Sequence, residues 1–91
     1  MKIVINTCYG GISISERAMA RLAELQGSPC LTPYPEDRAN PLLVQVVEEL
    51  GELASGALAE LKIVDIPDGI DWEIEEYDGK EWVAERHQTW G

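Results

Sequence analysis

Basic residues are scarce in this chain. Its 91 residues include 7 Lys and Arg against 17 Asp and Glu, which gives a formal net charge of -10 at pH 7. Sequence-independent binding to nucleic acid and binding to an anionic membrane both rely on excess Lys and Arg that neutralise phosphate, so we expect neither. A basic partner suits this charge better. Mimicry of nucleic acid stays open as an alternative to a plain acidic surface that keeps the protein soluble.

Cysteine and histidine are also few, with 2 Cys and 1 His. Cys8 and Cys30 lack the spacing of zinc ligands and His87 cannot complete a four-ligand site with them, so we expect no metal and no cofactor. Ile14 stands where the loop of cysteine-dependent phosphatases places an arginine, which predicts an inert, buried Cys8 thiol and no enzyme. No apolar run approaches the ~20 residues of a membrane helix and no signal-peptide pattern is present, which predicts a cytoplasmic protein with free thiols.

Phenylalanine is absent, so the large aromatic surface is carried by 3 Trp and 3 Tyr. Trp72, Tyr77, Trp82 and Trp90 gather in the C-terminal part of the chain, which therefore holds an unusual share of bulky side chains. A chain of this length has room for one core, which predicts a single domain over residues 1–91.

The order of apolar patterns predicts an α+β fold of order β-α-α-β-β-β, with a small sheet that ends in a C-terminal β-hairpin and two helices packed on one face. The expected strands are residues 2–6, 61–66, 72–77 and 80–87. The first of these is apolar almost throughout, which is typical of a strand buried on both faces.

Both helices have recognisable ends. Ser13 and Glu16 have the spacing of a capping box that opens a helix running to about Gln26, with Gly27 as its C-cap. Asn40 followed by Pro41 is typical of the start of a second helix. We expect Gly56 to end or interrupt that helix.

Asp78-Gly79 between two alternating segments is a strong hairpin signal. A two-residue turn predicts the pairs Ile74 with Val83, Glu75 with Trp82, Trp72 with Glu85, and Asp71 with Arg86. One face then carries Trp72, Ile74 and Val83, and the other carries Glu73, Glu75, Tyr77 and Trp82. A bulge in the turn would shift the register by one residue and exchange the faces.

The segment from Cys8 to Ser13 is the first candidate site. A strand, a glycine pair and a helix N-terminus would aim backbone N–H groups at one point, which suits an anion or a phosphate. A tight turn also needs glycine for steric reasons alone, so that alternative stays open. The candidate ligand-binding residues are Tyr9, Gly10, Gly11, Ser13, Arg17, Arg38 and Arg86, with arginines reaching the ligand directly or across a subunit interface.

The hairpin is the second candidate site. Alternation on a half-exposed strand explains its many glutamates better than paired acid–base catalysis or a divalent metal does. The candidate partner-binding residues are Glu73, Glu75, Tyr77, Trp82 and Trp90. The closing segment that contains Trp90 either binds a ligand or a neighbouring subunit, or packs onto the domain.

Several of these segments together carry a resemblance. They are Lys2 to Asn6 with Cys8-Tyr9-Gly10-Gly11, the helix from Pro41 to Gly51, residues 61–67, and Glu75 to Gly79 with Trp82 to Glu85. In them the chain resembles a group of small uncharacterised proteins found in bacteriophages and prophages. The resemblance covers most of the chain and implies no catalytic activity; Ile12 stands where those proteins usually have an aromatic residue.

A phage origin implies a protein that acts on its host by occupying a protein surface or by binding a small signal molecule. We expect a non-enzymatic, homo-oligomeric accessory protein of the host bacterial cytoplasm. It would counter host defence by binding and sequestering a nucleotide-type signal molecule near Tyr9 to Ser13. The alternative is an acidic inhibitor that binds a basic host protein, acting in defence or in nucleic-acid binding, through the C-terminal hairpin.

Overall fold

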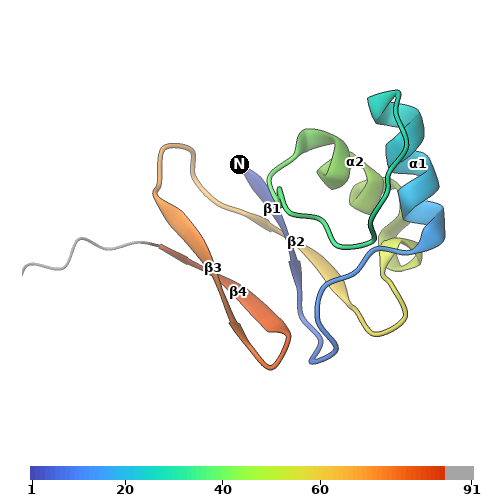
Figure 1. The fold of residues 1–91 in the computed structure, drawn as a ribbon. Helices are drawn as coiled ribbons and strands as arrows, with labels where there is room; N and C mark the ends of the chain where they lie inside the picture. Colours follow the sequence, from blue (N-terminus) through green and yellow to red (C-terminus); the bar gives the residue numbers. More distant parts are fainter. Residues whose placement is uncertain (86–91) are drawn as a thin grey trace, which may run out of the picture.

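The computed structural model describes residues 1–85, in which a layer of helices and a C-terminal hairpin lie on either side of a central pair of strands (Figure 1). The elements are, in order, β1 (Lys2–Asn6), α1 (Glu16–Gln26), α2 (Pro41–Leu50), the 3-10 helix η1 (Gly51–Ala54), β2 (Leu61–Asp65), β3 (Trp72–Tyr77) and β4 (Lys80–Glu85). The predicted α+β class and the order β-α-α-β-β-β are confirmed. Within residues 1–85, no helix is long and apolar enough to span a membrane.

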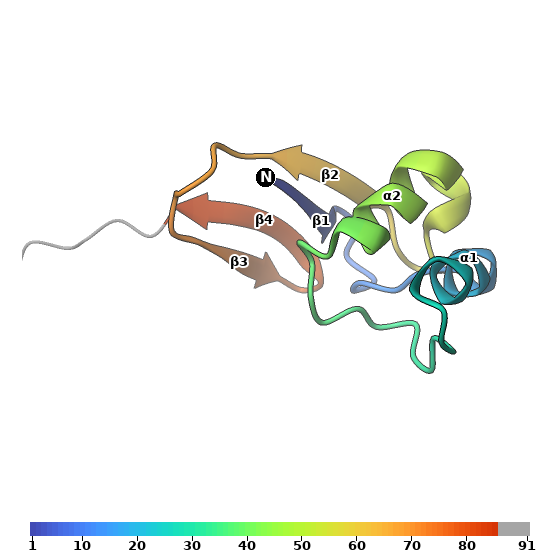
Figure 2. The ribbon, with the colours of Figure 1, turned by 90° about the horizontal axis from the view of Figure 1, so that it is seen from above.

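The strands form two antiparallel pairs instead of one small sheet. β1 pairs with β2, and β3 pairs with β4 (Figure 2). In the second pair Ile74 lies opposite Val83 and Glu75 opposite Trp82, so the predicted register is confirmed. Asp78 and Gly79 have φ values of 53° and 93°, and two positive φ values are what a bulge-free two-residue turn of this type requires. The predicted partner of Asp71 lies outside the described residues.

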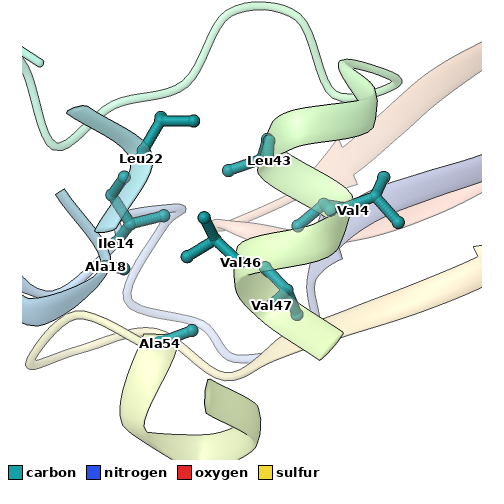
Figure 3. Packing of buried hydrophobic residues seen from close by; sticks show 9 residues of the cluster. Val4, Ile14, Ala18, Leu22, Leu43, Val46, Val47 and Ala54 are labelled. Carbon is teal, nitrogen blue, oxygen red and sulfur yellow. The ribbon is translucent and has the colours of Figure 1, made fainter. Parts of the chain in front are cut away.

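The core lies between the helices and one face of β1. Its buried side chains are Val4, Ile14, Ala18, Leu22, Leu43, Val44, Val46, Val47 and Ala54 (Figure 3). Ile3 and Ile5 point to the opposite face of β1 and are also buried. Since β4 contacts β1, the C-terminal hairpin covers this second face. The prediction that the first strand is buried on both sides is therefore confirmed.

The start of α1 differs from the sequence prediction. The N-cap is Ser15, whose Oγ accepts a hydrogen bond from the N–H of Ala18 at 3.1 Å, and the helix begins at Glu16. The capping box at Ser13 is wrong because Ile14 forms an isolated β-bridge with Ser55, which keeps this segment extended. Helix α1 ends as predicted at Gly27, in the left-handed region.

The end of α2 also differs. Asn40 caps its start, accepting from the N–H of Leu42 at 3.0 Å, and Pro41 is the first helical residue, as predicted. The helix ends at Leu50 instead of near Gly56, because Gly51 takes a φ of 56° that turns the chain into the 3-10 helix. Gly56 lies beyond η1, where its N–H donates to the carbonyl of Ser13 at 3.0 Å.

Candidate functional site

Arg38 lies in a buried ion pair. Its Nη1 and Nη2 donate to the two carboxylate oxygens of Glu81 at 2.6 and 2.8 Å, and the two side chains are only 13% and 9% exposed. Its Nε also donates to the carbonyl of Pro35 at 3.0 Å, and Nη1 to that of Val4 at 3.4 Å. The planar fork of donors that would bind a phosphate is therefore engaged inside the protein.

This ion pair closes the edge of β1 that faces away from β2. The N–H of Val4 donates to the carbonyl of Arg38 at 2.9 Å, and the N–H of Asn6 donates to Glu81 Oε1 at 2.8 Å. A loop residue and a side chain of β4 thus satisfy backbone groups that a further strand would otherwise pair. The contact fastens the C-terminal hairpin to the central strands.

Asn6 extends the same buried network. Its Nδ2 donates to the carbonyls of Cys8 and Gly79 at 2.7 and 2.8 Å, and its Oδ1 accepts from the N–H of Glu60 at 2.9 Å. Every buried side-chain nitrogen and oxygen in residues 1–85 has a partner. The interior polar groups therefore hold three chain segments together and leave no unpaired group aimed at a ligand.

The glycine pair after β1 is explained by close packing. A Cβ at Gly10 would overlap the carbonyl oxygen of Leu58, and a Cβ at Gly79 would lie 2.6 Å from the carbonyl oxygen of Tyr9. The backbone of this loop thus lies between residue 58 and the hairpin turn. Gly11 has a φ of 85°, which favours glycine. These observations favour the steric alternative for the glycine pair.

The backbone donors near the start of α1 are also used. The N–H of Ile14 donates to the carbonyl of Pro33 at 2.8 Å, and that of Ser15 to the carbonyl of Ala54 at 2.9 Å. The Oγ of Ser15 occupies the N–H of Ala18. Of the N–H groups in the first turn of α1, that of Ala18 is therefore already occupied, and the two N–H groups just before the helix are bound to carbonyls.

The other residues of the predicted ligand set are dispersed. Tyr9 and Arg17 are exposed, Ser13 packs against Gly56, Arg38 lies in the buried ion pair, and Arg86 lies outside the described residues. The described part of the chain does not gather these residues around one cavity. The nucleotide site near the glycine pair therefore stays a prediction, in which Arg38 has a partner inside the protein instead of a free guanidinium.

The outer face of the C-terminal hairpin presents aromatic and acidic side chains together. Trp82 is 43% exposed and Tyr77 is 71% exposed. The Nε1 of Trp82 donates to Glu75 Oε2 at 3.0 Å across the strand pair, which holds the indole in place. Exposed aromatic rings that are held rigidly are typical anchors of protein interfaces.

Tyr9 borders this outer face. The ammonium of Lys80 lies 5.7 Å from the centroid of the Tyr9 ring, and Lys80 pairs with Tyr77 in the strand register. The exposed fraction of Tyr9 is 60%. We call the resulting surface the aromatic–acidic face, and it consists of Tyr9, Glu73, Glu75, Tyr77, Lys80 and Trp82.

The opposite face of the hairpin points toward β1. Trp72, Ile74 and Val83 are half-buried there, as the alternation predicts, and Glu81 is buried among them. The face assignment made from the sequence is therefore confirmed for these residues. Trp90 of the predicted partner-binding set lies outside the described residues.

Comparison of the chain with protein-family models, with curated proteins and with solved structures gives no match.

Both cysteines lie in the described part of the chain. Cys8 and Cys30 are free thiols, and each is half-buried, so Cys8 is less enclosed than predicted. Within residues 1–85, no group of His, Cys, Asp or Glu side chains could hold a metal ion.

The sequence analysis did not predict three features of these sites: the buried hydrogen bonds of Asn6, the contact of Lys80 with Tyr9, and the ion pair of Arg38 with Glu81. Strand alternation does place Glu81 on the same face as Ile74 and Val83, so its burial could have been predicted from the sequence. Nothing local indicates that Arg38, 43 residues away, is its partner. The contact of Lys80 with Tyr9 likewise depends on how the hairpin folds back onto the loop after β1.

Proposed function

We propose that this protein is a non-enzymatic binding module that attaches to a basic surface of another protein through the aromatic–acidic face. The observation that carries the proposal is Trp82, a large indole left 43% exposed on a rigid strand pair and oriented by Glu75. Burying such a ring against a partner removes apolar surface from water without ordering a flexible side chain.

The charge of the face sets the kind of partner. On the aromatic–acidic face, Glu73 and Glu75 stand against Lys80 alone. The exposed Glu76, Asp78 and Glu85 add negative charge elsewhere on the hairpin, whereas Glu81 is buried on the opposite face and paired with Arg38. Complementary charge speeds encounter with a basic protein and disfavours acidic ones, and the net charge of -10 on the whole chain acts in the same direction. The resemblance to phage proteins makes a host protein the partner we propose, with inhibition by occupation of its surface.

The nucleotide hypothesis stays a prediction. Its geometry is less favourable because Arg38 and the N–H groups of Ile14, Ser15 and Ala18 already have partners inside the protein. Homo-oligomer formation also stays a prediction, and the mass of the native protein in solution tests it.

Capture from a bacterial lysate tests the proposed function. The immobilised protein is compared with Trp82→Ala and with Tyr34→Ala, which removes an exposed aromatic ring from the loop 28–40. We expect a basic protein bound by the parent and by Tyr34→Ala, with affinity at least about 30-fold lower for Trp82→Ala, the loss typical of an interface anchor. Raising the salt concentration slows its association.

Two outcomes would contradict the proposal. Either Trp82→Ala captures the same partner as strongly as Tyr34→Ala does, or the captured partner is acidic and insensitive to salt. Circular dichroism of each variant confirms that the fold is kept. Release of a nucleotide from the purified parent protein would instead support the nucleotide hypothesis and a site in the loop after β1.

A further inference from the structure

The contact between Lys80 and Tyr9 points to how the aromatic–acidic face selects its partner. Lys80 is the only Lys or Arg in the segment 72–85, and six carboxylates surround it in sequence. Its ammonium nevertheless makes no ion pair with any residue in the range 1–85 and lies over the Tyr9 ring, 5.7 Å from the centroid. A cation within about 6 Å of an aromatic centroid is attracted by the electron-rich face of the ring.

We infer that Lys80 is an internal stand-in for a cation of the partner, and that a Lys or Arg side chain of the partner displaces it from Tyr9 on binding. This inference rests on the proposed function and deepens it by naming the group that is recognised. The face already binds one ammonium, and it does so at an exposed site where the attraction is weak and a competitor can replace it.

The surroundings of Tyr9 favour such an exchange. Lys80 pairs with Tyr77, and Trp82 lies two residues further along β4 on the same exposed face. A displaced ammonium therefore has solvent beside it, while an arriving one enters a face that also carries Tyr77 and Trp82. Glu75 lies opposite Trp82 in the register and supplies a carboxylate next to the rings. Aromatic rings flanked by a carboxylate form the environment that recognises Lys and Arg side chains.

Lys80 therefore weakens partner binding in two ways, by its charge and by its place on the ring. Replacing Lys80 with methionine removes both, and the chain offers a control that removes only a charge. Lys62 is an exposed lysine of β2 that makes no ion pair with any residue of the described range. Lys62→Met changes the net charge by the same amount at a position in β2, outside the hairpin.

The first experiment uses acetylated, amidated octalysine and octaarginine peptides as probes, with affinity measured by calorimetry at about 0.1 M salt. We expect Lys80→Met to bind about two- to five-fold more tightly than Lys62→Met, the range that an exposed cation–π contact allows. In a Tyr9→Ala background this difference becomes smaller, because only the local charge of Lys80 still separates the two variants. Equal affinities of Lys80→Met and Lys62→Met, or weaker binding by Lys80→Met, would overturn the inference.

A second measurement tests the contact in the free protein. We expect the ring current of Tyr9 to shift the Hε protons of Lys80 upfield in the NMR spectrum. Tyr9→Ala should remove this shift, and a saturating octalysine peptide should remove it too. A shift that persists at saturation would show that the probe does not displace Lys80.

The failure of this inference is distinguishable from failure of the proposed function. If Lys80→Met behaves like Lys62→Met while Trp82→Ala loses the probe, the face binds cations without exchanging Lys80. If Trp82→Ala binds the probe as strongly as Tyr34→Ala does, the aromatic–acidic face itself is not the binding surface.

Discussion

Replacing Glu81 with glutamine tests the contact that fastens the C-terminal hairpin to the rest of the fold. The carboxylate accepts three hydrogen bonds, two from Arg38 and one from the N–H of Asn6. Glutamine keeps one acceptor oxygen but turns an NH₂ group toward a guanidinium that also only donates. Arg38 is then left as a charge with little access to solvent and an incomplete partner.

The expected loss of stability follows from the burial of the ion pair between Arg38 and Glu81. Breaking a buried ion pair by changing one partner costs about 3–5 kcal/mol, and Glu81→Gln should lie near the lower end because one hydrogen bond to each neighbour is kept. A protein of 91 residues has a free energy of unfolding of about 5–14 kcal/mol. The substitution thus removes a large share of the total stability.

Urea unfolding followed by tryptophan fluorescence and by circular dichroism measures this loss. The matched control is Glu85→Gln, which removes the same charge from an exposed position at the end of β4 and should change the free energy of unfolding by no more than about 0.5 kcal/mol. A loss below about 1 kcal/mol for Glu81→Gln, or an equal loss for both variants, would refute the argument that the ion pair holds the hairpin.

A double variant separates the charge from the hydrogen bonds. Arg38→Met with Glu81→Leu leaves no unpaired charge, and apolar replacement of a buried ion pair is often neutral or stabilising. Here we expect only partial recovery relative to Glu81→Gln, since the N–H of Asn6 then loses its acceptor. Full recovery would show that the N–H of Asn6 finds water instead.

Two further predictions concern the loop after β1 and the helix surface. Gly10→Ala should lower the free energy of unfolding by about 2–3 kcal/mol because its Cβ would meet the backbone of Leu58. Gly11→Ala should cost only about 1–2 kcal/mol, the strain of a positive φ in open space; equal losses in urea unfolding would contradict the packing argument. The guanidinium of Arg21 lowers the pKa of Glu49 from 4.5 to about 2, so this carboxylate stabilises the fold above pH 4.5 and loses that effect as the pH falls through about 2. Thermal midpoints of the parent and of Glu49→Gln should therefore differ at pH 6 and converge near pH 2, and a constant difference would contradict the assignment.

Local signals in the sequence were sufficient for most of the elements. The β-branched run of the first strand, Asn40 with Pro41, and Asp78-Gly79 each act over a few residues, and each lies where it was expected. The hairpin turn also sets the register, so the faces of β3 and β4 follow from alternation alone. Exposure of Trp82 and Tyr77 was therefore predictable.

The error at the start of α1 has a long-range cause. Ser13 has the spacing of an N-cap, but pairing of the adjacent Ile14 with Ser55 keeps the segment extended and moves the cap to Ser15. Contact with a residue about 40 positions away outweighs a capping preference of about 1 kcal/mol.

By itself the sequence determined the fold class, the order of the elements, the acidic charge and the two faces of the C-terminal hairpin, because periodicity, turn chemistry and charge are local or additive properties. Only the tertiary structure decided three contacts: Arg38 forms an ion pair with Glu81, the backbone at Gly10 lies too close to Leu58 for a side chain, and Lys80 lies over the Tyr9 ring. Each of these depends on segments that are distant in the chain and meet only when the hairpin packs against β1, and no pattern within a short window carries that information.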